Sequence, residues 1–375
     1  MSVRPFAESD TDAFQRLRRL AFSATDGLGS PQAWSGLVAE DASGVVGALR
    51  AWDYRQFFGG RAVPCGGVAS VVVLPHVGGQ GVARDLLRAS VRMMREAGQP
   101  VSALYPTVPA VYQRHGWEQV GALERLPVPI DVLTRLRPEL PVRPAAESDL
   151  PALHAAYLRT AARVDGMLDR CGPAFTLGDV LDLDFVHVVE GRTGLRGYLT
   201  ADRRSDALVV HDVIADDATT ATALLASLGS WSSVAAEVTL RLIDPAVELL
   251  LARTATAIDV HPWMLRVVDL PAAVAARGWP AVSSARPFAV DIEITDSDAP
   301  WHAGRHRLVW DGEKVTCEPG GSGDVRLGPR GLAAWFACAA DTHTLRRAGL
   351  LTGGPADGLD TLTGGRRLVR MADEF

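Results

Sequence analysis

The sequence predicts an α+β protein built from two similar units, each with a mixed central sheet flanked by helices, and a third α+β unit. The chain has 375 residues, enough for roughly two to four domains. An eight-residue motif occurs twice, at residues 3–10 and 142–149. Beyond about residue 263 the pattern of strand-like and helix-like segments changes. We therefore expect units at residues 1–132, 133–265 and 266–375.

The composition is that of an ordinary globular chain. Apolar residues make up 47% and charged residues 22%, which gives no reason to expect disorder. The formal net charge of −6 argues against a nucleic-acid-binding protein, which usually carries a basic patch. No run of about 18 apolar residues suggests a membrane span, and residues 1–8 lack the apolar stretch of a signal peptide. We expect a cytoplasmic protein.

Cysteine and histidine spacing predicts neither a metal site nor disulfides. The four cysteines are scattered without a CxxC pair, and the nine histidines include no HExxH motif. We expect reduced, mostly buried thiols and no metal.

The repeated motif reads Val-Arg-Pro-Phe-Ala-Glu-Ser-Asp in the first copy and Val-Arg-Pro-Ala-Ala-Glu-Ser-Asp in the second. Each copy precedes a helix-like segment, at residues 12–20 and 150–162. In both, a short strand would end at the proline, and the Ser/Asp pair would cap the unpaired amides of the next helix. The shared context favours duplication of a whole unit.

The first unit reads as strands alternating with helices. Residues 44–52 and 62–73 are strand-like, and the second run is almost continuously apolar, as in a buried central strand. Residues 81–97 form a helix whose apolar side chains recur on one face, with Gly98 ending it. A strand at 101–105, a short helix at 109–114 and a strand at 117–126 complete the unit.

A glycine-rich turn joins the central strand to this helix. Residues 71–83 read Val-Val-Val-Leu-Pro-His-Val-Gly-Gly-Gln-Gly-Val-Ala. Such a turn exposes several backbone amides at the positive end of a helix dipole, and glycines let an anion approach the backbone closely. The turn is a candidate phosphate site, and a plain strand–helix connection is the alternative.

The stretch resembles motif A of the GNAT superfamily of acyl-CoA-dependent N-acyltransferases, Arg/Gln-x-x-Gly-x-Gly/Ala. The resemblance implies that the pyrophosphate of acetyl-CoA binds the turn, and that the preceding strand's backbone polarises the acetyl carbonyl. Family members often carry basic residues where Gly78 and Gly79 stand; His76, Arg84 or Arg88 are candidates to supply that charge. The implied cofactor-binding residues are Val71, Val72, Val73, Gly78, Gly79, Gln80, Gly81, Val82, Ala83 and Arg84.

Residues 111–117, Val-Tyr-Gln-Arg-His-Gly-Trp, resemble the family's late motif, Tyr-x-Arg-x-Gly-aromatic. The thiolate that leaves when an amine attacks a thioester needs a proton, and a nearby phenol can donate it. By resemblance Tyr112 takes this general-acid role. The alternative is a tyrosine that packs its ring in the core. We expect Tyr105 to be structural.

The second unit lacks this glycine turn. A constant offset of 139 places Asp217 and Ala218 at the positions of Gly78 and Gly79, and Thr219-Thr220 at Gln80-Gly81. Carboxylates there would repel a pyrophosphate. Asp217 also reads as a cap of the helix at 218–228. Under either interpretation we expect this copy to bind no coenzyme A.

The third unit shows strands at 290–294, 305–310 and 314–317, a hairpin turn at Asp311-Gly312, a helix at 331–340 and a last helix before Phe375. Its W-x-x-R-x-x-D start at Trp263 and the Gly-Arg-x-x-Leu run at Gly304 resemble a sterol-carrier-protein-like domain. Two tandem GNAT folds followed by this domain resemble the enhanced intracellular survival (Eis) family of N-acetyltransferases.

This resemblance implies that the carboxylate of Phe375 enters the first unit's site as general base, with Glu374 beside it. A free α-carboxyl has a pKa of about 3.3–3.7, and burial would raise it. The alternative is that the chain end frays. Related acceptor pockets suggest Phe22, Asp26 and Trp34 as substrate contacts, although a surface-loop aspartate and a core tryptophan explain two of them equally well.

The resulting hypothesis is an N-acetyltransferase that moves the acetyl group of acetyl-CoA to a primary amine, aminoglycoside-like or lysine-type, by direct attack in a ternary complex. The family implies a homo-oligomer, a trimer-based hexamer. Two alternatives remain open from sequence: a GNAT enzyme with a different acyl donor, and a non-catalytic lipid- or ligand-binding protein.

Overall fold

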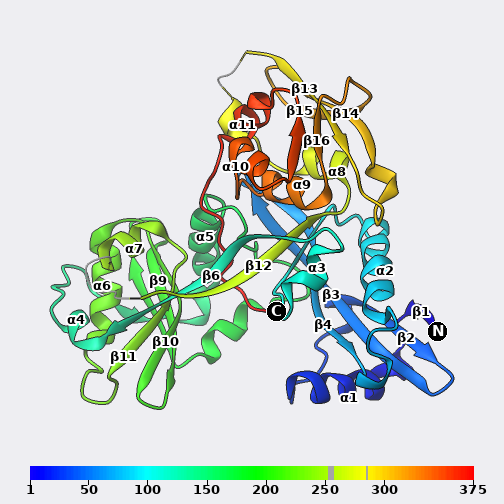
Figure 1. The fold of residues 1–375 in the computed structure, drawn as a ribbon. Coiled ribbons are helices and arrows are strands. Elements are labelled where there is room, and N and C mark those ends of the chain that lie inside the picture. The colour runs from blue at the N-terminus through cyan, green and yellow to red at the C-terminus, as the bar shows by residue number, and fades with distance from the viewer. Residues whose placement is uncertain (252–256, 284–285) are drawn as a thin grey trace.

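The computed structural model describes residues 1–251, 257–283 and 286–375. One 12-stranded sheet runs through two repeats, and a separate five-stranded sheet forms the third unit. Figure 1 shows the two repeats side by side, with the third unit above the first of them. Within the described ranges, no helix is both long and apolar enough to cross a bilayer.

The first repeat has the strand order β1-β2-β3-β4-β5, with only β4 and β5 parallel. Helices α1 and α2 cover opposite faces of this sheet. Alternate residues of β2 point into the two cores, Leu37 into the one beneath α2 and Val38 into the one beneath α1. Its elements are β1 (Ser2–Pro5), α1 (Thr11–Phe22), β2 (Trp34–Asp41), β3 (Gly44–Phe58), β4 (Arg61–Val73), α2 (Val82–Glu96), β5 (Val101–Leu104), α3 (Pro109–Gln113) and β6 (Glu118–Pro129).

The second repeat has the matching order β7-β8-β9-β10-β11, again with only its last pair parallel. The duplication inferred from the octet therefore extends to the topology. Its elements are α4 (Ile130–Thr134), β7 (Arg143–Pro144), α5 (Leu150–Ala161), β8 (Phe185–Glu190), β9 (Leu195–Arg204), β10 (Ala207–Ala215), α6 (Ala218–Gly229), β11 (Glu237–Arg241), α7 (Pro245–Leu251) and β12 (Asp259–Val267).

The shared octet folds into the same turn twice. Arg4 binds both oxygens of Asp10, whose carboxylate also accepts the amide of Ala7 at 2.8 Å. Arg143, Asp149 and Ala146 repeat these contacts, again with 2.8 Å to the amide. The expectation that the acidic residue caps the following helix is wrong, because its carboxylate closes the preceding turn and neutralises the arginine.

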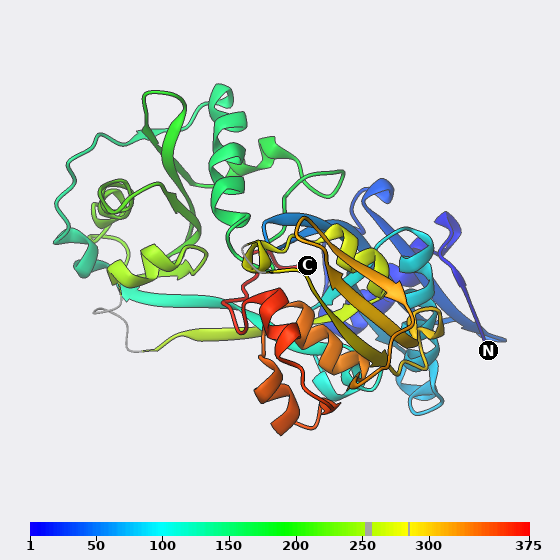
Figure 2. The ribbon, with the colours of Figure 1, turned by 90° about the horizontal axis from the view of Figure 1, so that it is seen from above.

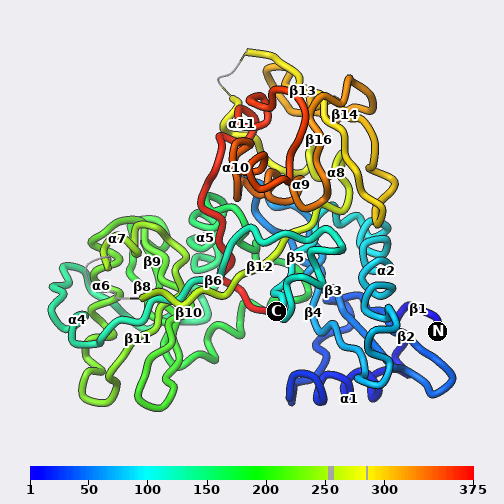
Figure 3. Tube along the Cα trace, viewed as in Figure 1, coloured from blue at the N-terminus to red at the C-terminus, as the bar shows by residue number. Residues whose placement is uncertain are grey.

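The two repeats exchange their last strands. Strand β6 pairs with β11 of the second repeat, and β12 pairs with β5 of the first, while β6 and β12 pair with each other at the centre. Figure 3 shows β6 and β12 running between the two repeats. Boundaries near residues 132 and 265 therefore divide the chain in sequence, but the 12-stranded sheet is continuous through both repeats.

The third unit packs a five-stranded sheet, in the order β15-β14-β13-β16-β17, against short helices. The expected hairpin turn is present, with Asp311 donating its amide to the Lys314 carbonyl. Strands β16 and β17 were not predicted. The elements are α8 (Leu270–Ala276), β13 (Phe288–Ile294), β14 (Gly304–Trp310), β15 (Val315–Pro319), β16 (Val325–Leu327), α9 (Pro329–Phe336), α10 (Thr342–Arg347), β17 (Leu351–Gly353) and α11 (Asp357–Thr363).

The C-terminal residues 369–375, called the tail below, follow α11 in a non-helical conformation. The Arg370 amide bonds the Asp165 carbonyl of the second repeat at 2.9 Å, and the Met371 amide bonds the Ala122 carbonyl of β6. Met371 and Ala372 are almost fully buried. The chain end therefore does not fray, and Figures 1 and 2 place it between the two repeats.

Candidate functional site

The site begins where β4 and β5 separate. Their parallel pairing ends at Gly67 and Ala103, although β4 continues to Val73. A bulge shifts the β3–β4 register in this continuation, and Ser70 there has φ 53°, a left-handed conformation rare outside glycine. We call the diverging segments 68–73 and 104–105 the first fork. It opens an edge of β4 that β5 no longer covers.

The glycine-rich turn lies at the end of this strand, as predicted. Gly79 and Gly81 have φ 78° and 86°, and a side chain on Gly79 would meet nothing within 4 Å. Helix α2 starts at Val82, so its first amides have no partner inside the helix. Open space in front of free amides at a helix start fits a pyrophosphate.

The cations near the turn are already engaged to different degrees. Arg88 binds Asp298 of the third unit at 2.7 Å, and Arg84 binds its neighbour Asp85 at 2.9 Å. The Arg84 guanidinium nevertheless lies over Gly81, where a Cβ would be 2.7 Å from its Nη2. Of the three predicted cations, Arg84 is directly over the turn and His76 is exposed beside it.

Tyr112 lies on α3 in the core beside α2. Its side chain is buried, in a cluster that includes Val82, Leu86 and Trp117. Burial raises the pKa of Tyr112, so the phenol is neutral at physiological pH and able to donate a proton. The predicted short helix is confirmed, and the general-acid role stays a prediction.

The last residue of the chain lies at the start of the first fork. The Phe375 ring is 5.1 Å from the Tyr54 ring on β3 and 5.5 Å from the Tyr105 ring beyond β5. A Cβ on Gly67 would be 3.0 Å from the Phe375 ring and 2.6 Å from Tyr54. Glycine at position 67 therefore leaves the room that both rings occupy.

Further rings extend this contact into an aromatic row. The Trp52 ring stacks on Tyr54 at 6.1 Å, Phe175 of the second repeat lies 5.4 Å from Tyr54, and His261 of β12 stacks on Tyr105 at 4.6 Å. Trp52, Tyr54, Phe175 and His261 were not predicted, because the row draws on both repeats and on the exchanged strand, and Tyr105 was expected to be structural. The row comprises Trp52, Tyr54, Tyr105, Phe175, His261 and Phe375.

Arginines surround the carboxylate of Glu374. Arg125 of β6 donates to it at 2.5 Å and Arg241 of β11 at 3.2 Å. Burial alone would raise the pKa of Glu374, but the hydrogen bond and charge of Arg125, with Arg241, outweigh it and lower the pKa. The penultimate carboxylate is therefore ionised and fixes the tail between β6 and β11.

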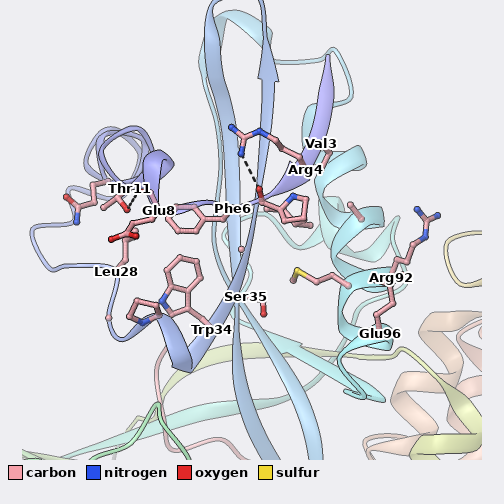
Figure 4. Close-up of a pocket in the computed structure, with 18 residues that line it drawn as sticks. Val3, Arg4, Phe6, Glu8, Thr11, Leu28, Trp34, Ser35, Arg92 and Glu96 are labelled. Atoms are coloured by element: carbon pink, nitrogen blue, oxygen red, sulfur yellow. Dashed lines mark hydrogen bonds between the residues drawn. The ribbon is translucent and has the colours of Figure 1, made fainter.

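The other predicted acceptor contacts lie around α1. Phe22 is exposed at the end of α1, and Asp26 pairs with Arg18 at 2.8 Å. Trp34 is buried against Phe6 and lines a cavity of about 890 Å³ at the β1–β2 edge, between α1 and α2 (Figure 4). Phe22 and Asp26 are not among the described residues lining this cavity, so the structure does not gather the predicted set.

The second repeat lacks the counterpart of the turn. Eight residues, 74–81, separate β4 from α2, whereas only Asp216 and Asp217 separate β10 from α6. Asp217 accepts the Thr220 amide at 2.8 Å, which confirms the capping interpretation. That hydrogen bond, followed by one from Arg196, lowers the pKa of Asp217 to about 2. The constant offset of 139 aligned the turns wrongly, because six residues are missing.

A second difference concerns Tyr112. Helix α3 begins Pro-Ala-Val-Tyr and α7 begins Pro-Ala-Val-Glu, so Glu248 takes the position of Tyr112. Glu248 accepts a hydrogen bond from Arg370 of the tail at 2.6 Å. The second repeat thus uses this position to hold the chain end.

Comparison with known proteins agrees with this geometry. Residues 2–120 match the model of an acetyltransferase (GNAT) domain, and residues 270–368 match that of a sterol carrier protein domain. A solved GCN5-related N-acetyltransferase from Kribbella flavida is 31% identical, covers 100% of this chain and 98% of its own, and superposes with a TM-score of 0.86. The chain belongs to the GNAT superfamily.

This GNAT protein is similar to further proteins along most of its length. An uncharacterised N-acetyltransferase from Streptomyces coelicolor is 29% identical, with 82% of this chain and 80% of the relative covered. Eis1 from Mycobacterium abscessus shares the fold over 100% of both chains, with a TM-score of 0.73 and 19% identity. The protein is an acyl-CoA-dependent N-acetyltransferase with tandem GNAT folds and a sterol-carrier-protein-like domain, which sets aside the non-catalytic alternative.

Proposed function

We propose that this GNAT protein is an Eis-like enzyme that transfers the acetyl group of acetyl-CoA to a primary amine by direct attack in a ternary complex. The observation that carries the proposal is the path of the tail. It brings Phe375 against Gly67 at one end of the first fork, while the glycine-rich turn lies at the other end of the same strand. Donor and proton acceptor would thus meet along β4.

Acetyl-CoA would supply the activated acyl group. The backbone amides of residues 79 and 81–83 would hold its pyrophosphate, with Arg84 adding positive charge over Gly81. The backbone of Val71, Val72 and Val73, in the part of β4 that β5 leaves uncovered, would polarise the acetyl carbonyl. Gly78 and Gln80 shape the turn through their bonds to the Pro75 and Val77 carbonyls.

Two groups of this chain would move the protons. An amine arrives largely as ammonium and must lose a proton before it attacks, and the Phe375 carboxylate is proposed as the base. Tyr112 is proposed to protonate the leaving thiolate, a role its burial supports because the neutral phenol is favoured.

The acceptor is proposed to be an aminoglycoside-like or lysine-type amine. The aromatic row beside Phe375 offers ring faces that attract an ammonium group. Phe22, Asp26, Trp34 and Glu374 remain proposed contacts for the rest of the acceptor. The trimer-based hexamer of the Eis family is proposed as the assembly.

Release of free thiol from acetyl-CoA over a panel of amines tests this proposal. Chains with two glycines added at the C-terminus or at the N-terminus are compared with the intact chain. We expect the C-terminal extension to lower kcat by about 10²–10⁴-fold, the usual range for acid–base groups, and the N-terminal one to have no effect. Equal rates for all three chains would eliminate the terminal carboxylate as base. Faster turnover with propionyl-CoA would instead favour a different donor.

A further inference from the structure

The second repeat also diverges where the first one does. Pairing of β10 with β11 ends at Val210 and Leu240, while β10 continues to Ala215. We call residues 211–215 and 241–242 the second fork. Asp212 lies there, almost fully buried, and accepts a hydrogen bond from the Tyr198 hydroxyl at 2.8 Å. The first fork thus receives the Phe375 ring at its start, whereas the second fork contains a buried carboxylate.

Arg170 links this carboxylate to the tail. Its guanidinium donates to both oxygens of Asp212, at 2.5 and 3.0 Å, and to Asp373 at 2.9 Å. It also lies 4.0 Å over the ring of Tyr157. Arg170 has φ 50°, a left-handed conformation that costs energy in a residue with a side chain. Several contacts therefore hold this one side chain in place.

The charges make Arg170 necessary for this arrangement. Burial raises the pKa of Asp373, and the charge of Arg170 opposes the rise. Burial would also raise the pKa of Asp212, but Arg170 and then Tyr198 lower it. Without the guanidinium, the buried carboxylate of Asp212 and the partly buried one of Asp373 would face each other, and the tail would move away or take up a proton.

Residue 373 is held from both repeats. Its carboxylate binds Arg170 of the second repeat, and its carbonyl accepts the Tyr105 hydroxyl of the first at 2.9 Å. Arg241 adds a bond to the carbonyl of Ala372 at 2.9 Å. Only two residues separate this anchor from the end of the chain. We propose that Arg170 is a positioning residue that orients the terminal carboxylate of Phe375, an inference that rests on the proposed function.

A double-mutant cycle tests the proposal. Arg170→Met is made in the intact chain and in the chain extended by two C-terminal glycines, and thiol release is measured with acetyl-CoA and the best amine of the panel. We expect R170M to lower kcat at least tenfold in the intact chain, to leave the KM for acetyl-CoA within twofold, and to be partly rescued by R170K. In the extended chain, R170M should cause no further loss.

Each outcome has a separate meaning. Equal losses from R170M in both backgrounds, or no loss in the intact chain, would overturn the positioning role while leaving the terminal base standing. A harmless C-terminal extension would eliminate the terminal base, and the proposed role of Arg170 with it, while thiol release in the same assay would leave the acetyltransferase proposal standing.

Two further variants guard against misfolding. Asp373→Asn removes the charge that Arg170 binds but keeps the guanidinium, and should reproduce the loss of kcat; full activity of D373N would count against the proposal. Arg143→Met is the matched control, because Arg143 forms the same bidentate contact with Asp149 in the second repeat without touching the tail. R143M should keep the native kcat.

Discussion

The two repeats share strand order, the octet turn and the position of their forks, yet they differ at the places where chemistry would occur. The first repeat has an eight-residue glycine turn before α2, a tyrosine on α3 and a fork that receives Phe375. The second has a two-residue acidic connection, Glu248 on α7 and a fork filled by the Arg170–Asp212 pair. The fold is thus separable from the site that it carries.

The differences in the second repeat have a common effect. Glu248 binds Arg370, Arg170 binds Asp373, and Arg241 binds Glu374, so three of its residues hold three residues of the tail. The repeat without the glycine turn thus holds the chain end beside the repeat that has it. Under the proposed function, this contact gives the second repeat a role without a cofactor site of its own.

The largest expected effect comes from making the first repeat resemble the second at one residue. Gly81 is the residue before α2, and Asp217 occupies that place before α6. Gly81→Asp would put a carboxylate at the proposed pyrophosphate site and a Cβ at φ 86°, close to Arg84. We expect kcat/KM for acetyl-CoA to fall at least about 100-fold, because like charges about 4 Å apart repel by roughly 4 kcal/mol at an effective dielectric constant of about 20.

Gly81→Asn separates charge from backbone strain, because its side chain has the same shape without the charge. It should retain much more affinity than G81D in a thermal-shift titration with coenzyme A, since a ligand that prefers the folded state raises stability. Equal affinities of G81D, G81N and the native chain for coenzyme A would show that the turn is not part of the cofactor site.

The second prediction concerns the position that is Tyr112 in the first repeat and Glu248 in the second. Tyr112→Phe removes the proposed proton donor while keeping the ring, and should lower kcat about 100-fold with little change in either KM. Glu248→Gln in the second repeat should lower kcat by less than about tenfold, because Arg241 and Arg170 still hold the tail. Steady-state thiol release measures both. A Y112F enzyme with native kcat would show that Tyr112 packs in the core and is not the general acid.

Sequence patterns captured what local rules determine. The turn before α2, the short helix carrying Tyr112 and the hairpin at Asp311 follow from glycine placement and periodicity, and all are present. The aromatic row was not predictable this way. Tyr54 and Phe175 meet because the second repeat packs on β3, a contact between residues over 100 positions apart.

The strand exchange was also invisible to local rules. Nothing in residues 259–267 indicates that they pair with β5 of the first repeat, because any apolar strand satisfies the same pattern. The constant offset did not align the glycine turn of the first repeat with the acidic connection of the second for a related reason. Such an offset assumes equal loop lengths, and the connections between elements are the parts whose length varies most.

The third prediction concerns the turn that both repeats keep. The arginine hydrogen bonds lower the pKa of Asp10 and of Asp149. Each carboxylate therefore stabilises the fold above its ordinary pKa of about 3.9, and this contribution is lost as the pH falls through the lowered value. Asp10→Asn and Asp149→Asn should each lower the free energy of unfolding by about 1–2 kcal/mol at pH 7.

Urea unfolding at pH 7 and pH 3 measures this effect. The deficit of each variant should shrink at pH 3, because this is below the ordinary carboxyl pKa of about 3.9 and the unfolded chain already takes up the proton there. Asp10 is the more buried of the two, so D10N should show the larger deficit. Deficits that do not change with pH would mean that the charge of the pair contributes nothing and that shape alone holds the turn.

The smallest expected effect comes from the corresponding position in the second repeat. Asp217→Ala removes the carboxylate that accepts the Thr220 amide and the Arg196 guanidinium, and helix N-caps of this kind contribute about 1 kcal/mol. Thiol release should be unchanged, because α6 lies outside the proposed site, while the urea midpoint falls slightly. Asp341→Ala, at the start of α10 with the same contact to the Thr344 amide, is the matched control in the third unit. A loss of activity in D217A alone would show that the second repeat takes part in catalysis through more than the tail.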